Sequence, residues 1–208
     1  YKPGSLSMDR FRLSSGPNYL NGKIELSGTN GSLNNFNSDG NINMIVDNSK
    51  IELISMFPKN NYLSGIPPLK ISFSANGSLS ELEFEDLKVS NVFLKLFANL
   101  NVKNLFKVDG LKVKMFTNSL NFNIDELRKI SSFPLQVKEN FLKISNFNLK
   151  GTTIFSLNDF NFDLFSKNKW GDFSTVGKLG LGILNKNKRN KSFKVHGRIK
   201  NFKLSHLT

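Results

Sequence analysis

Hydrophobic and polar residues alternate with a period of two along most of the chain, as in residues 24–26, 71–75 and 94–102. Lys, Asn, Ser, Asp or Glu mostly separates the apolar residues of these runs. Because successive side chains of a β-strand point to opposite faces of a sheet, each run predicts a strand with one apolar and one polar face. The expected fold is mainly β, an antiparallel meander of roughly a dozen or more strands.

Glycine-containing pairs between the runs predict the hairpin turns. Asn-Gly and Asp-Gly supply the positive φ values that tight hairpins require. The string Asn-Gly-Ser-Leu occurs at residues 30–33 and again at 76–79, which indicates a repeated β unit. The expected turns are Asn21-Gly22, Asn30-Gly31, Asp39-Gly40, Asn76-Gly77, Asp109-Gly110 and Lys150-Gly151.

Two short segments carry helix signals. Residues 51–57 form one, which Pro58 ends. Residues 125–130 form the other, with acidic residues first and basic residues last, as the helix dipole favours, and Pro134 follows it. The two prolines divide the chain into three predicted β-repeat blocks, of which the second ends in a short helix: 1–58, 59–134 and 135–208.

The composition changes this picture mainly through its aromatic residues. The chain has 20 Phe but only 3 Tyr and 1 Trp. Phe supplies apolar bulk without a polar group, so we expect a wide apolar surface, although an AT-rich genome also produces a chain rich in Phe, Asn and Lys. The absence of cysteine excludes disulfides and thiol catalysis.

The net charge of +13 is spread along the chain. The densest basic cluster sits among Asn and Ser, so it predicts a loop between strands, either simply solvated or attracted to phospholipid headgroups. No segment reaches the length of a membrane helix, and Tyr1 begins the chain without a signal-peptide pattern. We therefore expect an internal piece of a longer protein. The basic cluster named above comprises Lys186, Lys188, Arg189, Lys191 and Lys194.

No arrangement of residues predicts catalysis. The two histidines, His196 and His206, lack metal-site spacing. The carboxylates at positions 81, 83 and 85 share one strand face, where solvation is the ordinary state. The glycines at 177, 180 and 182 are interpreted as strand bends or bulges. We therefore expect no enzyme, no cofactor and no metal. Because the aromatic residues alternate away from the lysines, we also expect no nucleic-acid partner.

An antiparallel sheet with one apolar face must hide that face. Three arrangements do so: a compact core, a membrane barrel with its apolar face outward, and a sheet curled lengthwise around an open groove. The membrane barrel is disfavoured because it carries Tyr and Trp girdles, and this chain has few of either. The residue pattern alone leaves the compact core and the open groove undecided.

Four segments resemble the TamB/AsmA-like envelope proteins (translocation and assembly module TamB). Residues 20–28 resemble their strand pattern x-G-x-h-x-L-x-G, where h is apolar. Residues 50–53, followed by Phe57 and Pro58, are similar to the break after such strands in Bacteroidetes-type members. Residues 77–82 resemble their G-S-L-x-x-L turn, and residues 125–134 their short helical insertion. The resemblance covers residues 5–205 and marks the chain as an internal fragment.

The resemblance implies an elongated meander curled into an open hydrophobic groove (β-taco-like), with one or two short helices. Family members lie in the periplasm, anchored at the inner membrane, here through a segment outside this chain, and reach toward the outer membrane. The implied function is to carry phospholipid acyl chains between the two membranes, to support outer-membrane protein assembly, or both. The implied partners are phospholipid, the two membranes and an outer-membrane β-barrel protein. The alternative is a scaffolding β-domain of a larger envelope complex.

Residues of the apolar face are the expected lining of such a groove. There, acyl chains slide along the apolar face while headgroups stay in water. The expected lining residues are Phe73, Phe84, Leu94, Leu96, Val113, Phe122, Ile144, Phe160 and Phe162.

Overall fold

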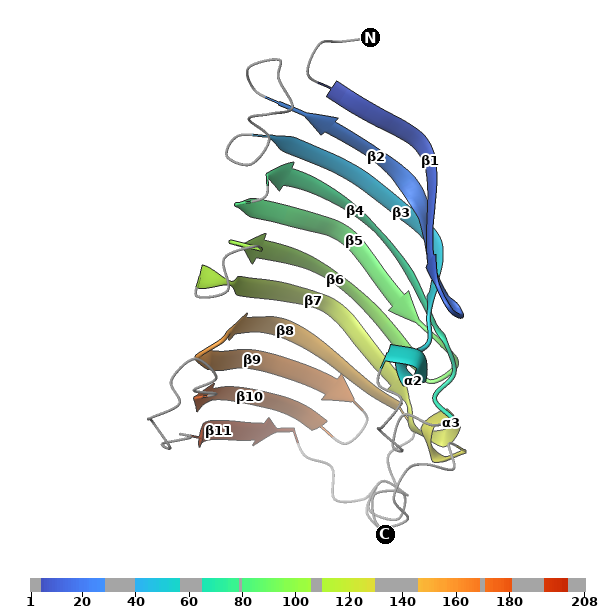
Figure 1. Cartoon of the computed structure of the whole chain (residues 1–208). Helices are drawn as coiled ribbons and strands as arrows, with labels where there is room; N and C mark the ends of the chain where they lie inside the picture. Colours follow the sequence, from blue (N-terminus) through green and yellow to red (C-terminus); the bar gives the residue numbers. More distant parts are fainter. Residues whose placement is uncertain are drawn as a thin grey trace.

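The computed structural model of the chain describes residues 5–28, 40–56, 65–78, 80–105, 110–129, 146–168, 171–180 and 193–201. Within them, eleven strands form one sheet in which each strand pairs with its neighbours in the sequence (Figure 1). All pairings are antiparallel. The strands are β1 (Ser5–Ser15), β2 (Asn18–Ser27), β3 (Asn41–Ile51), β4 (Leu69–Ser78), β5 (Glu81–Ser90), β6 (Leu94–Lys103), β7 (Lys112–Asn123), β8 (Asn146–Ser156), β9 (Asp159–Asn168), β10 (Gly171–Gly180) and β11 (Phe193–Lys200).

Two short helices interrupt the meander, α2 (Leu53–Met56) after β3 and α3 (Ile124–Arg128) after β7. Both lie at the same end of the sheet (Figure 1). The Asn123 side-chain oxygen accepts hydrogen bonds from the backbone N–H groups of Asp125 (3.1 Å) and Glu126 (3.3 Å). Asn123 therefore caps α3, because it satisfies N–H groups that have no partner within the helix. Both helices lie where the sequence predicts them, to within a few residues.

The register aligns most apolar positions of the eleven strands on one face. Leu82 pairs with Val102, Val102 with Val113, and Val113 with Phe155. Directly paired residues in an antiparallel sheet point to the same side, so each such row crosses several strands on one face. We call this the apolar face. The opposite face carries the polar residues that alternate with it.

A row of register irregularities crosses the sheet. One occurs between each successive pair of strands from β1 to β8. At two of them Asn48 and Asp86 adopt positive φ, 46° and 50°, a conformation that short polar side chains tolerate. Bulges of this kind bend a strand and increase its twist. We call the row the crease, and along it the sheet curls lengthwise (Figure 1).

The apolar face lies on the concave side of the curl. Val46, Ala75, Ala98 and Thr117 are buried beside the crease, and all four belong to the apolar face. In the described residues, extensive contacts join only neighbouring strands, apart from those of α3 with β7 and β8. Within the described residues, no second layer therefore accounts for this burial. The side chains bury one another because they converge on the concave side, and the polar face is convex. The antiparallel meander that the residue pattern predicts, and the open curl that the family resemblance implies, are thus confirmed.

Three of the expected glycine turns are wrong. Asn21-Gly22 lies inside β2, Asn76-Gly77 inside β4 and Lys150-Gly151 inside β8. A Cβ on Gly22 would lie 2.1 Å from the carbonyl oxygen of Ile45, so this glycine permits a close approach of β3 rather than a turn. The first hairpin turns instead at residues 16–17. Asn30, Gly31, Asp39 and Asp109 lie outside the described residues.

The three-block division stays a prediction. One sheet continues through α2 and α3, which interrupt it after β3 and after β7. The boundaries at residues 58 and 134 lie outside the described residues.

Candidate binding groove

Eight of the nine expected lining residues lie together on the concave apolar face, and all eight are half-buried. The ninth, Ile144, lies outside the described residues. Half-burial means that each side chain contacts its neighbours on the sheet and still exposes part of its surface to the hollow of the curl. The eight are Phe73 on β4, Phe84 on β5, Leu94 and Leu96 on β6, Val113 and Phe122 on β7, and Phe160 and Phe162 on β9.

Aromatic contacts link several of these residues. The rings of Phe73 and Phe84 lie 5.2 Å apart between centroids, tilted by 59°. The rings of Phe160 and Phe162 lie 5.8 Å apart, tilted by 37°. Tilted pairs at this separation are favourable aromatic geometry. Both pairs lie among the residues that the sequence selects.

Further residues complete the lining. Leu100 pairs with both Phe84 and Met115, and Met115 pairs with Thr153, which pairs with Phe162. This row joins the two aromatic pairs across β5 to β9. Period-two alternation already marks Leu100 and Met115 as apolar-face positions, but only the register shows that they lie between the aromatic pairs.

One glycine of this face makes room for an aromatic ring. A Cβ on Gly177 would lie 2.1 Å from Cζ of Phe162, so the Phe162 ring lies across β10 at this position. The interpretation of Gly177 as a bend or bulge is wrong, because β10 pairs with β9 and β11 in unbroken register. Gly180 ends β10, and Gly182 lies outside the described residues.

The apolar face is open at both edges of the sheet. Leu13 on β1 is 64% exposed and Phe193 on β11 is 69% exposed. Leu6 and Met8 on β1, and Val195 and Ile199 on β11, are exposed as well. The edge strands have a paired neighbour on one side only. Their apolar side chains are therefore covered by the side chains of one neighbouring strand, whereas those of central strands are covered from both sides.

Comparison of the chain with protein-family models, with curated proteins and with solved structures finds no match in any of the three. The family resemblance at residues 20–28 and 77–82 therefore stays a prediction. The functional argument below is based on the geometry of the sheet.

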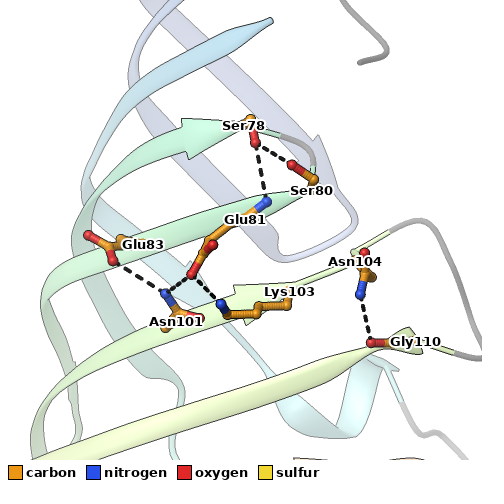
Figure 2. A network of polar contacts seen from close by, with 8 residues as sticks. All are labelled: Ser78, Ser80, Glu81, Glu83, Asn101, Lys103, Asn104 and Gly110. Carbon is orange, nitrogen blue, oxygen red and sulfur yellow. Dashed lines mark hydrogen bonds and ion pairs between the residues drawn. The ribbon is translucent and has the colours of Figure 1, made fainter. Parts of the chain in front are cut away.

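The convex face carries a polar network across β5 and β6 (Figure 2). The Glu81 carboxylate accepts hydrogen bonds from Nζ of Lys103 (2.8 Å) and Nδ2 of Asn101 (2.9 Å). Asn101 also donates to Glu83 at 3.3 Å. These donors, Lys103 first and Asn101 second, hold the pKa of the Glu81 carboxyl below its ordinary value. The carboxylates at positions 81, 83 and 85 are exposed, as the sequence predicts, and the cross-strand bonds of Glu81 and Glu83 favour a structural role.

Side-chain hydrogen bonds also close the turns beside this network (Figure 2). The Ser78 hydroxyl accepts from the Glu81 backbone N–H at 3.2 Å and lies 2.7 Å from the Ser80 hydroxyl. Nδ2 of Asn104 donates to the carbonyl oxygen of Gly110 at 3.1 Å. These bonds fix the ends of β4 to β7 and so help to hold their register.

The remaining candidates for chemistry are placed as follows. His196 is exposed on the convex face of β11, as predicted. Lys194 belongs to β11 rather than to a loop, whereas the other four residues of the basic cluster lie outside the described residues.

Within the described ranges, no three His, Asp or Glu residues are grouped as a metal site would require. Neither described helix has the length and apolar character needed to span a bilayer.

The expectation that phenylalanine side chains lie only on the face opposite the lysines is wrong for three of the described residues. Phe97, Phe116 and Phe165 lie on the convex face. Nζ of Lys88 lies 5.9 Å from the Phe97 ring centre, and Nζ of Lys114 lies 4.4 Å from that of Phe116. In each case the preceding residue already occupies the concave face, so the alternation of the strand turns the phenylalanine outward.

Proposed function

We propose that the concave apolar face carries phospholipid acyl chains, and that the chain is a periplasmic bridge segment between the inner and outer membranes. One observation supports this proposal most. Apolar side chains line one face of the sheet from β1 to β11, mostly half-buried on the inner strands and exposed on the two edge strands, and no second layer covers them in the described residues. A water-soluble domain seldom leaves so large an apolar surface open without a ligand or partner.

The dimensions of the sheet suit movement rather than storage. Ten strand spacings of about 4.8 Å give an apolar face about 48 Å long across the strands. One lipid tail spans about 15 Å, half of a hydrocarbon core about 30 Å thick. A tail therefore has several equivalent positions along the face. Successive positions offer the same aliphatic and aromatic groups, so a tail can leave one position without losing a specific polar contact.

The energetics permit retention without tight binding. Burial of one methylene group contributes about 0.8 kcal/mol, so full burial of about ten groups contributes about 8 kcal/mol. A face that covers a tail on one side supplies roughly half of that amount. This is enough to hold a tail against water and too little to trap it. Headgroups remain in solvent at the open side of the curl.

The family resemblance supports the remaining features of the proposal. It assigns an inner-membrane anchor outside this chain and a role in outer-membrane protein assembly with an outer-membrane β-barrel partner. The second candidate function is a scaffolding domain that carries no lipid. The exposed apolar side chains of β1 and β11 favour it, since they are suited to pack against neighbouring domains.

Photocrosslinking tests the proposal. Benzoylphenylalanine replaces Phe84 or Phe122 on the concave face, or Phe97 on the convex face as the matched control. The chain is purified from cells, freed of membranes and irradiated. We expect phospholipid adducts by mass spectrometry from positions 84 and 122 and none from position 97. A folded protein that gives no adduct at the concave positions, or equal adducts at all three, would favour the scaffolding domain.

A further inference from the structure

Charge is unevenly distributed over the strands. β7 to β11 carry eight Lys and Arg residues and three Asp residues, a net charge of +5. β1 to β6 carry eight cationic and seven acidic residues, a net charge of +1. All eight cationic residues of β7 to β11 alternate with apolar-face residues and point to the convex side. They are Lys112, Lys114, Lys150, Lys167, Lys178, Lys194, Arg198 and Lys200. We call this convex side of β7 to β11 the basic surface.

The fold itself makes little use of these cations. The ion pair of the basic surface in the described residues joins Nζ of Lys178 to Asp159 at 3.2 Å. The Asp172 carboxylate accepts a hydrogen bond from Nδ2 of Asn201 at 2.9 Å. Lys150 and Arg198 are exposed, and neither forms an ion pair with another described residue. The positive charge of the surface is therefore available to an external anion.

Apolar side chains interrupt the same surface. Phe116 is 41% exposed, Phe165 42% and Val176 50%. Lys150 pairs with Phe165, Phe165 with Ser174, and Ser174 with Arg198. This row sets an exposed phenylalanine between two free cations. Water solvates the cations well but not the ring, so an environment that accepts both is favoured.

A hollow of about 370 Å³ lies in the same surface across β8 to β11. Ile154 and Val176 supply apolar lining, Lys178, Lys194 and His196 supply basic groups, and Asp163 supplies one carboxylate. Eight of its lining residues form two adjacent cross-strand rows of the convex face, and the other two, Phe162 and Gly177, lie between these rows in the sequence of β9 and β10. The hollow thus combines apolar walls with two lysines and one carboxylate, and the excess of cationic groups suits an anionic headgroup together with its glycerol region.

We propose that the basic surface docks on a bilayer that contains anionic lipid. Cations attract anionic headgroups, and the phenylalanine rings and Val176 enter the interface beside them. Single-stranded nucleic acid is disfavoured as the occupant, because stacking needs open aromatic faces and the Phe116 ring is covered by Lys114. The site lies on the face opposite the groove. It is independent of lipid transport, and it would hold the sheet with its open concave side away from the membrane.

Vesicle binding tests this proposal. The purified chain is mixed with vesicles of phosphatidylcholine alone, or with vesicles that also contain phosphatidylglycerol, and the bound fraction is measured by flotation. The variant Lys150→Gln/Arg198→Gln removes two charges beside Phe165. The matched control Lys23→Gln/Lys70→Gln removes two exposed charges from β2 and β4. Phe165→Ser tests the apolar contribution.

We expect binding only to the phosphatidylglycerol vesicles, and we expect salt to weaken it. Each charge near an anionic surface changes partitioning about fivefold, so Lys150→Gln/Arg198→Gln should lower it about 25-fold. The control should change it far less. Equal binding to both vesicle types, or equal losses in the two double variants, would overturn the proposal. Tighter binding to a single-stranded oligonucleotide, lost in the same variant, would also overturn it. A chain that fails to carry lipid in its groove should still bind these vesicles.

Discussion

Replacement of Gly151 by Ala should destabilise the sheet where it curls. Gly151 lies in β8 beside the crease, between Thr117 of β7 and Leu164 of β9. Its φ is +141°, a value that side chains with a Cβ rarely adopt. A Cβ at this position would also lie 2.0 Å from the carbonyl oxygen of Asp163. The backbone of β9 cannot move away without loss of its pairing to β8.

The backbone strain and the steric clash together set the expected loss in the free energy of unfolding. Backbone strain of this kind costs about 1–3 kcal/mol, and overpacking typically costs about 1–3 kcal/mol. Replacement of glycine by alanine returns about 0.4–1 kcal/mol by restricting the unfolded chain. We therefore expect Gly151→Ala to lower the free energy of unfolding by roughly 2–4 kcal/mol.

Gly197→Ala is the matched control. A Cβ on Gly197 would meet only the Ser174 carbonyl oxygen, at 4.0 Å, so this variant should be neutral or slightly stabilising. The assay is urea unfolding followed by circular dichroism. If Gly151→Ala is as stable as Gly197→Ala, then β8 and β9 do not approach each other as closely as the structure has them, and the reasoning from their close backbone contact fails.

Three further predictions concern single contacts. Gly177→Ala should be less stable than the wild type, and Phe162→Ala should suppress that loss, because the clash is with the Phe162 ring; a double-mutant cycle on the free energy of unfolding checks this. Lys103→Met should raise the pKa of Glu81 toward its ordinary value of 4.5, as followed by NMR titration. Since folding lowers this pKa, the stabilisation is present above the unfolded value and is lost as pH falls through the folded value. Asn123→Ala should cost about 1 kcal/mol by uncapping α3, as measured by urea unfolding.

Strand positions and faces were predictable because period-two alternation directly reflects the geometry of a sheet. Phe84 and Phe162 share a face in the structure as they do in the pattern. The crease was not predictable, because a bulge leaves no reliable residue signature. Asn48 and Asp86 adopt positive φ there, yet many Asn and Asp residues of this chain do not.

Glycine was the main source of error. A tight turn with positive φ, a close approach of a neighbouring backbone and the packing of an aromatic ring against the strand all favour a residue without Cβ. The sequence does not distinguish these three uses of glycine. Asn21-Gly22 has the ordinary appearance of a hairpin turn, but Gly22 admits the backbone of β3. Gly177 admits a ring from β9. Only the register of the neighbouring strands separates these cases.

The basic surface depends on two features that a single-strand pattern does not show. Adjacent apolar residues, as at positions 115–116, leave open which one faces outward. Charges far apart in the sequence, such as Lys150 and Arg198, meet on one row only through strand pairing.

The most direct test of the groove compares two adjacent residues of β7. Met115→Asp places a charge on the concave face, and Phe116→Asp places the same charge on the convex face. Phospholipid bound to each purified, folded chain is quantified by mass spectrometry. We expect lipid in the wild type and in Phe116→Asp, and a large loss in Met115→Asp. A folded wild type without lipid, or equal lipid in both variants, would contradict the claim that the concave face binds acyl chains.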